Sequence, residues 1–189
     1  MDATYKRILT TINNKPRPQR ELARRVLIWI AYMRSPLQID DLAYAISIEL
    51  DTRSLEDLES SIPTKEYILD ACANLVSVDK ENNSDGGRYV RFVHFSVQEF
   101  LTSERSTTLS MGYKTVHREI ARTCMLYLTL FPFPKQSASR RLYWYAFHQW
   151  PHHLLAGNLN SLLVDDQILD SDSDIIILRK TPHTTYCST

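Results

Sequence analysis

The stretch LVSVDKENNSDGGRYVRFVHFSVQEFL, residues 75–101, decides the fold predicted for this chain. Its first part, Leu75–Asp79, alternates apolar and polar side chains with the period of two that is typical of a strand. Lys80–Gly87 is a polar segment that ends in Gly-Gly, and Arg88–Phe95 alternates again, so the three pieces predict a β-hairpin. The returning strand passes directly into a helix that we expect to begin at Ser96.

The junction between that strand and that helix carries the candidate site of the sequence. Ser96 and Glu99 have the Ser-x-x-Glu spacing of a capping box, in which each side chain accepts a hydrogen bond from the other residue's backbone N–H. Such a cap contributes about 1 kcal/mol. His94 lies beside this helix N-terminus, where free N–H groups and the helix dipole favour an anion such as phosphate. His94 is therefore a candidate nucleotide-sensing residue; the alternative is a half-buried histidine with a local hydrogen bond.

Upstream of the hairpin, apolar residues recur at helical spacing in several segments. The predicted helices are Asp2–Ile12, Glu21–Met33, Asp40–Ile48 and Thr64–Asn74. Pro16 and Pro18 are expected to separate the first two, Leu37–Ile39 to form a very short strand, and residues 51–63 to form a polar connector. Helix, short strand, two helices, hairpin and helix follow one another in the order of a winged helix. We place this domain at residues 36–105, after a helical linker, residues 1–35, that includes its first helix.

Downstream of the winged helix, the pattern is helical again. Lys114–Phe131 predicts one helix, and the aromatic-rich stretch Ser139–Leu155 a second one that Pro151 interrupts. The aromatic cluster Tyr143–Trp150 is expected to form core or a partly exposed docking face for a further domain. Residues 106–164 are thus a C-terminal helical segment and residues 165–189 an irregular tail. The predicted fold class is mainly α with a small β-hairpin, a winged helix flanked by helical segments.

The net charge of zero conceals an asymmetry. Residues 1–35 carry eight basic and two acidic side chains, whereas residues 36–105 carry six basic and fourteen acidic ones. This distribution predicts charge complementarity within the protein or with a neighbour, the alternative being ordinary solvated faces. It disfavours DNA binding, because DNA affinity depends on Lys and Arg neutralising phosphates and the helix Thr64–Asn74 sets Lys65 against Glu66 and Asp70.

Catalytic patterns are missing from the sequence. There is no Gly-x-Ser-x-Gly elbow, and Cys124, on an apolar helix face, is expected to be core packing rather than a nucleophile. His148, His152 and His153 lie close together, but Pro151 interrupts their helix and we expect core or surface histidines, not metal ligands. Three widely spaced cysteines and the lack of an apolar run of about 20 residues indicate an intracellular protein with free thiols and no membrane span. We expect no enzymatic activity, cofactor or metal.

Several motifs occur in the order found in one protein family. They are DATYKRIL at 2–9, RELARRVLIWI at 20–30, SPLQIDDLA at 35–43, VHFSVQEFL at 93–101 and WPHH at 150–153. Over about residues 1–155 the chain resembles the helical and winged-helix region of fungal NACHT-type STAND NTPases. This region often carries the label of a GPI inositol-deacylase winged-helix domain and commonly stands between a NACHT ATPase and ankyrin repeats.

The resemblance implies a role in regulation. In related STAND switches a histidine at the position of His94 contacts the phosphate of bound ADP, so the implied partners are a NACHT-type nucleotide-binding domain, in cis or in trans, and an ankyrin-repeat domain. Two departures matter: Gln38 replaces a helix-capping Thr, so that helix is expected to start less firmly, and no Gly-x-x-x-x-Gly-Lys-Ser/Thr loop occurs. The alternatives are a DNA-binding winged helix and a non-functional remnant of a larger protein.

Overall fold

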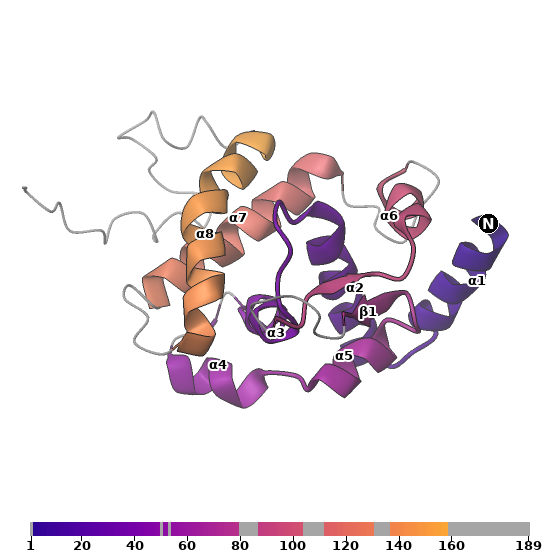
Figure 1. Ribbon diagram of the computed structural model, residues 1–189, viewed down its shortest axis with the longest axis horizontal. Coiled ribbons are helices and arrows are strands. Elements are labelled where there is room, and N and C mark those ends of the chain that lie inside the picture. Colours follow the sequence, from indigo (N-terminus) through magenta and orange to yellow (C-terminus); the bar gives the residue numbers. More distant parts are fainter. Residues whose placement is uncertain are drawn as a thin grey trace, which may run out of the picture.

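The computed structural model describes residues 2–49, 51–52, 54–79, 87–103, 112–130 and 137–158. Within these residues helices predominate around one small antiparallel sheet (Figure 1), so the predicted fold class is confirmed. In chain order the elements are α1 Asp2–Asn13, α2 Arg17–Tyr32, α3 Ile39–Ser47, α4 Leu55–Ser61, α5 Lys65–Ala71, β1 Val76–Val78, β2 Val90–Phe92, α6 Phe95–Thr102, α7 Tyr113–Leu130 and α8 Ser137–Ala156. The predicted tail, residues 165–189, and the loop residues 80–86 lie outside the described residues.

The sheet has the hairpin predicted from the alternation. Strands β1 and β2 pair antiparallel, with Val76 opposite Phe92 and Val78 opposite Val90. In place of the very short strand expected at Leu37–Ile39, Gln38 forms an isolated antiparallel bridge to Tyr89. This bridge ties the start of α3 to the far side of β2, as in a winged helix.

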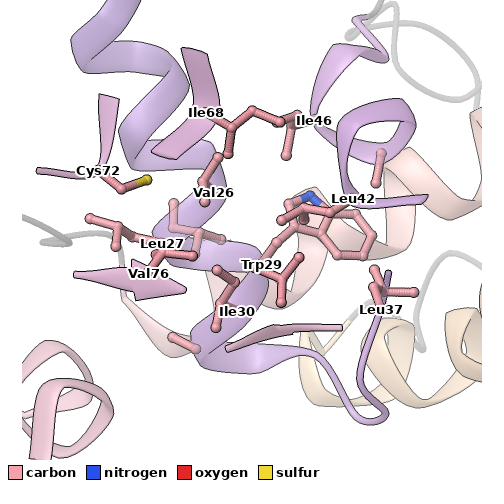
Figure 2. Close-up of a cluster of buried hydrophobic side chains, with 14 of the residues drawn as sticks. Val26, Leu27, Trp29, Ile30, Leu37, Leu42, Ile46, Ile68, Cys72 and Val76 are labelled. Atoms are coloured by element: carbon pink, nitrogen blue, oxygen red, sulfur yellow. The ribbon is translucent and has the colours of Figure 1, made fainter. Parts of the chain in front are cut away.

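Helix α2 is the centre of the core. Figure 2 shows its side chains Val26, Leu27, Trp29 and Ile30 surrounded by apolar side chains from α3, α5 and β1. Leu27, together with Leu42 of α3 and Ile68 of α5, is fully buried. Because burying such a side chain contributes about 1.5–3 kcal/mol, this cluster holds α2 against α3, α5 and β1.

The flanking helices pack on opposite sides of this core (Figure 1). Helices α7 and α8 lie side by side; α7 packs against α2 and α3, and α8 packs against α3. The ring of Trp29 in α2 lies 5.7 Å from that of Tyr145 in α8. Helix α1 packs against α2 and α6, with the rings of Tyr5 and Phe100 5.5 Å apart. The winged helix is therefore held between an N-terminal helix and a C-terminal helix pair.

Three local predictions were wrong. Residues 51–63 contain the short helix α4, whose first turn is capped by the Ser54 side chain accepting from the Asp57 N–H. Helix α2 begins at Arg17 rather than Glu21, because Pro18 falls in the first turn, where its missing N–H costs nothing. Helix α8 continues through Pro151 instead of being interrupted there.

Basic residues of the N-terminal segment form ion pairs with acidic residues of the rest of the fold. Lys15, from the basic segment, lies 3.0 Å from the Asp70 carboxylate of α5, and Arg25 lies 2.8 Å from Glu49. The predicted complementarity within the protein is confirmed at these pairs, each of which contributes about 0–1 kcal/mol at a surface. The exposed side of α5 carries Glu66 and Asp70, which makes it a poor surface for phosphates.

Among the described residues no helix is both long and apolar enough to cross a bilayer.

Candidate functional site

The candidate site is the turn from β2 into α6. His94 occupies the N-cap position of α6 in an extended conformation, with φ −141° and ψ 144°, and its side chain is exposed. Its neighbours are exposed too: Val93 is 41% and Phe95 73% accessible. The half-buried alternative for His94 is therefore wrong. An imidazole stands between two apolar side chains on the surface, next to a helix N-terminus.

The capping box predicted for Ser96 and Glu99 is wrong. Helix α6 begins at Phe95, so Ser96 lies inside the first turn, and no side chain caps the helix. The Ser96 hydroxyl instead lies 2.7 Å from the phenolic oxygen of Tyr5 in α1. The buried ring of Tyr5 against Phe100 holds that oxygen beside α6, so a tertiary partner replaces the local one.

The surface around Phe95 is anchored from two directions. The Gln98 side-chain amide donates to the Ala31 carbonyl at the end of α2 at 3.0 Å. The Val93 N–H donates to the Leu75 carbonyl at 3.1 Å, which holds the end of β2. Phe95 borders a groove that is also lined by Met33, Pro36, Tyr89, Phe92 and Gln98. The exposed side chains are thus presented by a fixed backbone.

Gln38, the residue that departs from the family pattern, does not cap α3 with its side chain. It occupies the N-cap of α3, and its side chain makes no capping hydrogen bond. Its Nε2 is buried without a partner among the described residues. The start of α3 is stabilised instead by Asp40 and Asp41 in its first turn, since carboxylates are favourable near a helix N-terminus.

The three histidines of α8 do not converge. The Nδ1 of His148 bonds to the Trp144 carbonyl of its own helix at 2.8 Å. His152 lies with its Nε2 3.4 Å from a guanidinium nitrogen of Arg34. His153 points into the interior. In the part of the chain that the structure describes, no group of three or more His, Cys, Asp or Glu side chains is arranged to hold a metal.

A buried pair of histidines joins α7 and α8. The Nδ1 atoms of His117 and His153 are 2.7 Å apart, and their exposed fractions are 3% and 0%. Burial, followed by the charge of His117, lowers the pKa of His153 to about 3. Burial and then His152 lower the pKa of His117 as well. The sequence reasoning missed His117, although its spacing to Ile120 and Cys124 places it on the apolar face of α7.

The described cysteines are packing residues. Cys124, on α7, is buried as predicted, and burial raises the pKa of its thiol. Burial raises the pKa of Cys72 to about 12. Because the thiolate is the reactive form, neither residue has the properties of a nucleophile.

Helix α8 leaves aromatic side chains exposed. Trp144 is 52% and Phe147 51% accessible, and Leu155 is exposed further along the helix. From Leu142 to Ala156 the sequence contains no Asp, Glu, Lys or Arg. The expectation that part of the aromatic cluster is exposed is confirmed. A solvent-facing helix surface without charge is unusual for a soluble protein and is typical of a contact surface.

Comparison with known proteins assigns the class. Residues 6–112, from within α1 to the residue before α7, match the family model described as "GPI inositol-deacylase, winged helix domain". The chain belongs to this winged-helix domain family. It is also 28% identical over 134 residues to the "Azaphilone pigments biosynthesis cluster protein L" of Monascus ruber. The matched part is 68% of this chain and 28% of that relative, so the chain spans well under half of the relative's length. No solved structure matches the chain.

Proposed function

We propose that this chain is a non-catalytic regulatory and interaction module of a fungal STAND-type NTPase. It packs on a NACHT-type nucleotide-binding domain, in cis or in trans, and relays the state of that domain to downstream repeats. Membership of the winged-helix family supports the class of module. The fungal source of the relative agrees with this origin.

The observation that carries the proposal is the exposed trio Val93, His94 and Phe95. Soluble proteins seldom place a 73% exposed phenylalanine on a backbone fixed on both sides unless another surface covers it. Large aromatic side chains supply much of the binding energy of protein interfaces. We therefore assign Phe95 and Val93 to the contact with the nucleotide-binding domain.

His94 would take part in the same contact with the nucleotide-binding domain. Its imidazole and the free N–H groups of the first turn of α6 would face the partner at the same point. Both favour a negatively charged group, and the partner domain supplies one in the phosphates of its bound ADP. His94 is thus the sensing half of a site whose nucleotide is held by the other domain.

The uncharged surface of α8 serves the second contact of this proposal. Trp144, Phe147 and Leu155 lie on the helix pair that follows the winged helix in the chain. A downstream repeat, such as an ankyrin repeat, would cover them. Movement of the winged helix on the nucleotide-binding domain would then be transmitted through α7 and α8.

The test is calorimetric titration of the full chain with an ADP-loaded NACHT domain from a fungal protein that carries this winged helix. We expect Phe95→Asp to weaken binding about 30-fold, the loss expected of an interface anchor worth about 2 kcal/mol. The matched control is Phe147→Asp, an equally drastic change at an exposed aromatic residue on α8, which should leave this binding unchanged. Equal binding by the wild type and Phe95→Asp would refute the assigned surface.

The sensing role has its own measurement. In the complex, His94→Ala is expected to speed the release of a fluorescent ADP analogue, whereas His148→Ala, on the exposed side of α8, should not. An unchanged release rate for His94→Ala would remove His94 from the site while leaving the contact surface in place.

A further inference from the structure

The α7–α8 pair is joined to the winged helix by a line of buried polar atoms. The Arg34 backbone N–H, in the connector after α2, donates to the Tyr145 hydroxyl oxygen at 3.3 Å. That hydroxyl lies 3.0 Å from Nε2 of His153, and His153 Nδ1 lies 2.7 Å from Nδ1 of His117. The line therefore begins at the winged helix, crosses α8 and ends on α7.

One assignment of donors and acceptors satisfies every hydrogen bond in this line. Because the Arg34 N–H can only donate, Tyr145 accepts there and is free to donate its own hydrogen to Nε2 of His153. A neutral His153 then carries its hydrogen on Nδ1 and donates it to Nδ1 of His117. Every contact has one donor and one acceptor in this order, provided that both imidazoles are neutral.

An added proton breaks the order. A proton on Nδ1 of His117 would point at the hydrogen on Nδ1 of His153, and these two nitrogens are 2.7 Å apart. On Nε2 of His153 it would turn the hydrogen of the buried Tyr145 hydroxyl away from its acceptor, and a buried donor without a partner is costly. In either case a positive charge would stand at a side chain that is at most 3% exposed.

Among the described residues, the groups that surround the histidine pair do not compensate such a charge. Tyr32 approaches from the end of α2 and Arg34 from the connector after it, Tyr113 and Cys124 from α7, and His152 from α8. Arg34 is cationic, and the others are neutral or can only become cationic near neutral pH. On α3 the acidic residue Asp41 lines the groove beside Tyr145, and no acidic group is among the causes that shift the pKa of either histidine.

We propose that this line of hydrogen bonds is an acid-sensitive latch, which holds the α7–α8 pair on the winged helix while His117 and His153 are neutral and releases it when either takes up a proton. The inference concerns the folded chain alone and is independent of the proposed partner domain. The direction of the pH effect follows from the linkage between protonation and folding. A histidine whose pKa is lowered by folding stabilises the fold above its unfolded pKa of about 6.5, and this stability is lost as the pH falls from there toward the folded value.

The size of the effect follows from His153. With a pKa of about 3 in the fold and about 6.5 when unfolded, lowering the pH from 7 to 5 raises the unfolding constant about 25-fold through this residue alone. The test is urea unfolding of the full chain at both values of pH. Between pH 7 and pH 5 the unfolding constant of His153→Asn should rise about 25-fold less than that of the wild type. The unfolding constant of His148→Asn, on the exposed side of α8, should rise as much as that of the wild type.

Three further measurements keep the proposal open to refutation if His153→Asn does not fold. His117→Asn retains an acceptor for His153 but cannot be charged, so its pH dependence should also be shallower. Nitrogen NMR shifts of the imidazoles at pH 6 should place the hydrogen of His153 on Nδ1. Hydrogen exchange in the wild type at pH 5 should show α7 and α8 opening before α2 and α3. Wild-type pH dependence in both variants, a charged His153 at pH 6, or simultaneous opening of all four helices would overturn the latch.

Discussion

The hydrogen bond between Tyr5 and Ser96 offers the sharpest test of how the candidate site is built. The two hydroxyl oxygens are 2.7 Å apart, and the Tyr5 ring is buried against Phe100. A net contribution of about 1 kcal/mol is expected for such a bond. Tyr5→Phe and Ser96→Ala should each remove it. The double variant should cost no more than either single one, apart from the small gain in helix propensity from alanine.

A double-mutant cycle on the full chain measures this coupling. Urea unfolding of the wild type, both single variants and the double variant gives an expected coupling free energy of about 1 kcal/mol, and the propensity gain of Ser96→Ala cancels in the cycle. Glu99→Ala is the control and should change stability by less than about 0.5 kcal/mol. A coupling below about 0.3 kcal/mol between Tyr5 and Ser96, together with a cost of about 1 kcal/mol for Glu99→Ala, would restore the capping box and refute this structure of the site.

The remaining predictions concern the core, the thiols, α8 and the surface. Leu27→Ala should lower the free energy of unfolding by about 2–5 kcal/mol in urea titrations, because Leu27 is fully buried at the centre of the winged helix. In a Cys187→Ser background, Cys72 and Cys124 should react with an aromatic disulfide reagent only as fast as the protein unfolds; modification within seconds of mixing would contradict their burial. Pro151→Ala should raise the melting temperature, since a proline inside a helix costs about 3 kcal/mol and α8 continues through it; an unchanged or lower value would mean that the helix is broken there. Lys15→Met should cost less than about 1 kcal/mol, and this loss should vanish in 1 M salt; a larger, salt-independent loss would show that Lys15 acts by packing.

The sequence predicted the winged helix because its strongest signals are local. Alternation in Leu75–Asp79 and Arg88–Phe95 and the apolar spacing of Glu21–Met33 identify elements that the structure contains. The missed helix α4 had a weaker signal. Its apolar residues are few, and the cap Ser54 is followed by Asp57, whose N–H rather than side chain completes the turn.

The errors at the site have a different origin. Ser96 and Glu99 fit a local motif, but the hydroxyl of Ser96 bonds to Tyr5, ninety-one residues earlier. His117 and His153 are thirty-six residues apart and meet only when α7 packs against α8. No pattern within a window of sequence contains either pairing. What the sequence offered was the spacing of His117 on an apolar helix face, which predicts burial but not its partner.

The two polar pairings attach the winged helix to its flanking helices in different ways, and this difference matters for the proposed role. Tyr5–Ser96 joins α1 to the turn that carries His94 through two hydroxyl groups. The line from Arg34 to His117 joins α7 and α8 to the other end of α2, and it depends on two neutral imidazoles. One attachment of the winged helix therefore contains no histidine, whereas we propose that the other is conditional on two. A module that transmits a change from one neighbour to another needs this difference, since the conditional joint can open while the surface that receives the signal keeps its shape.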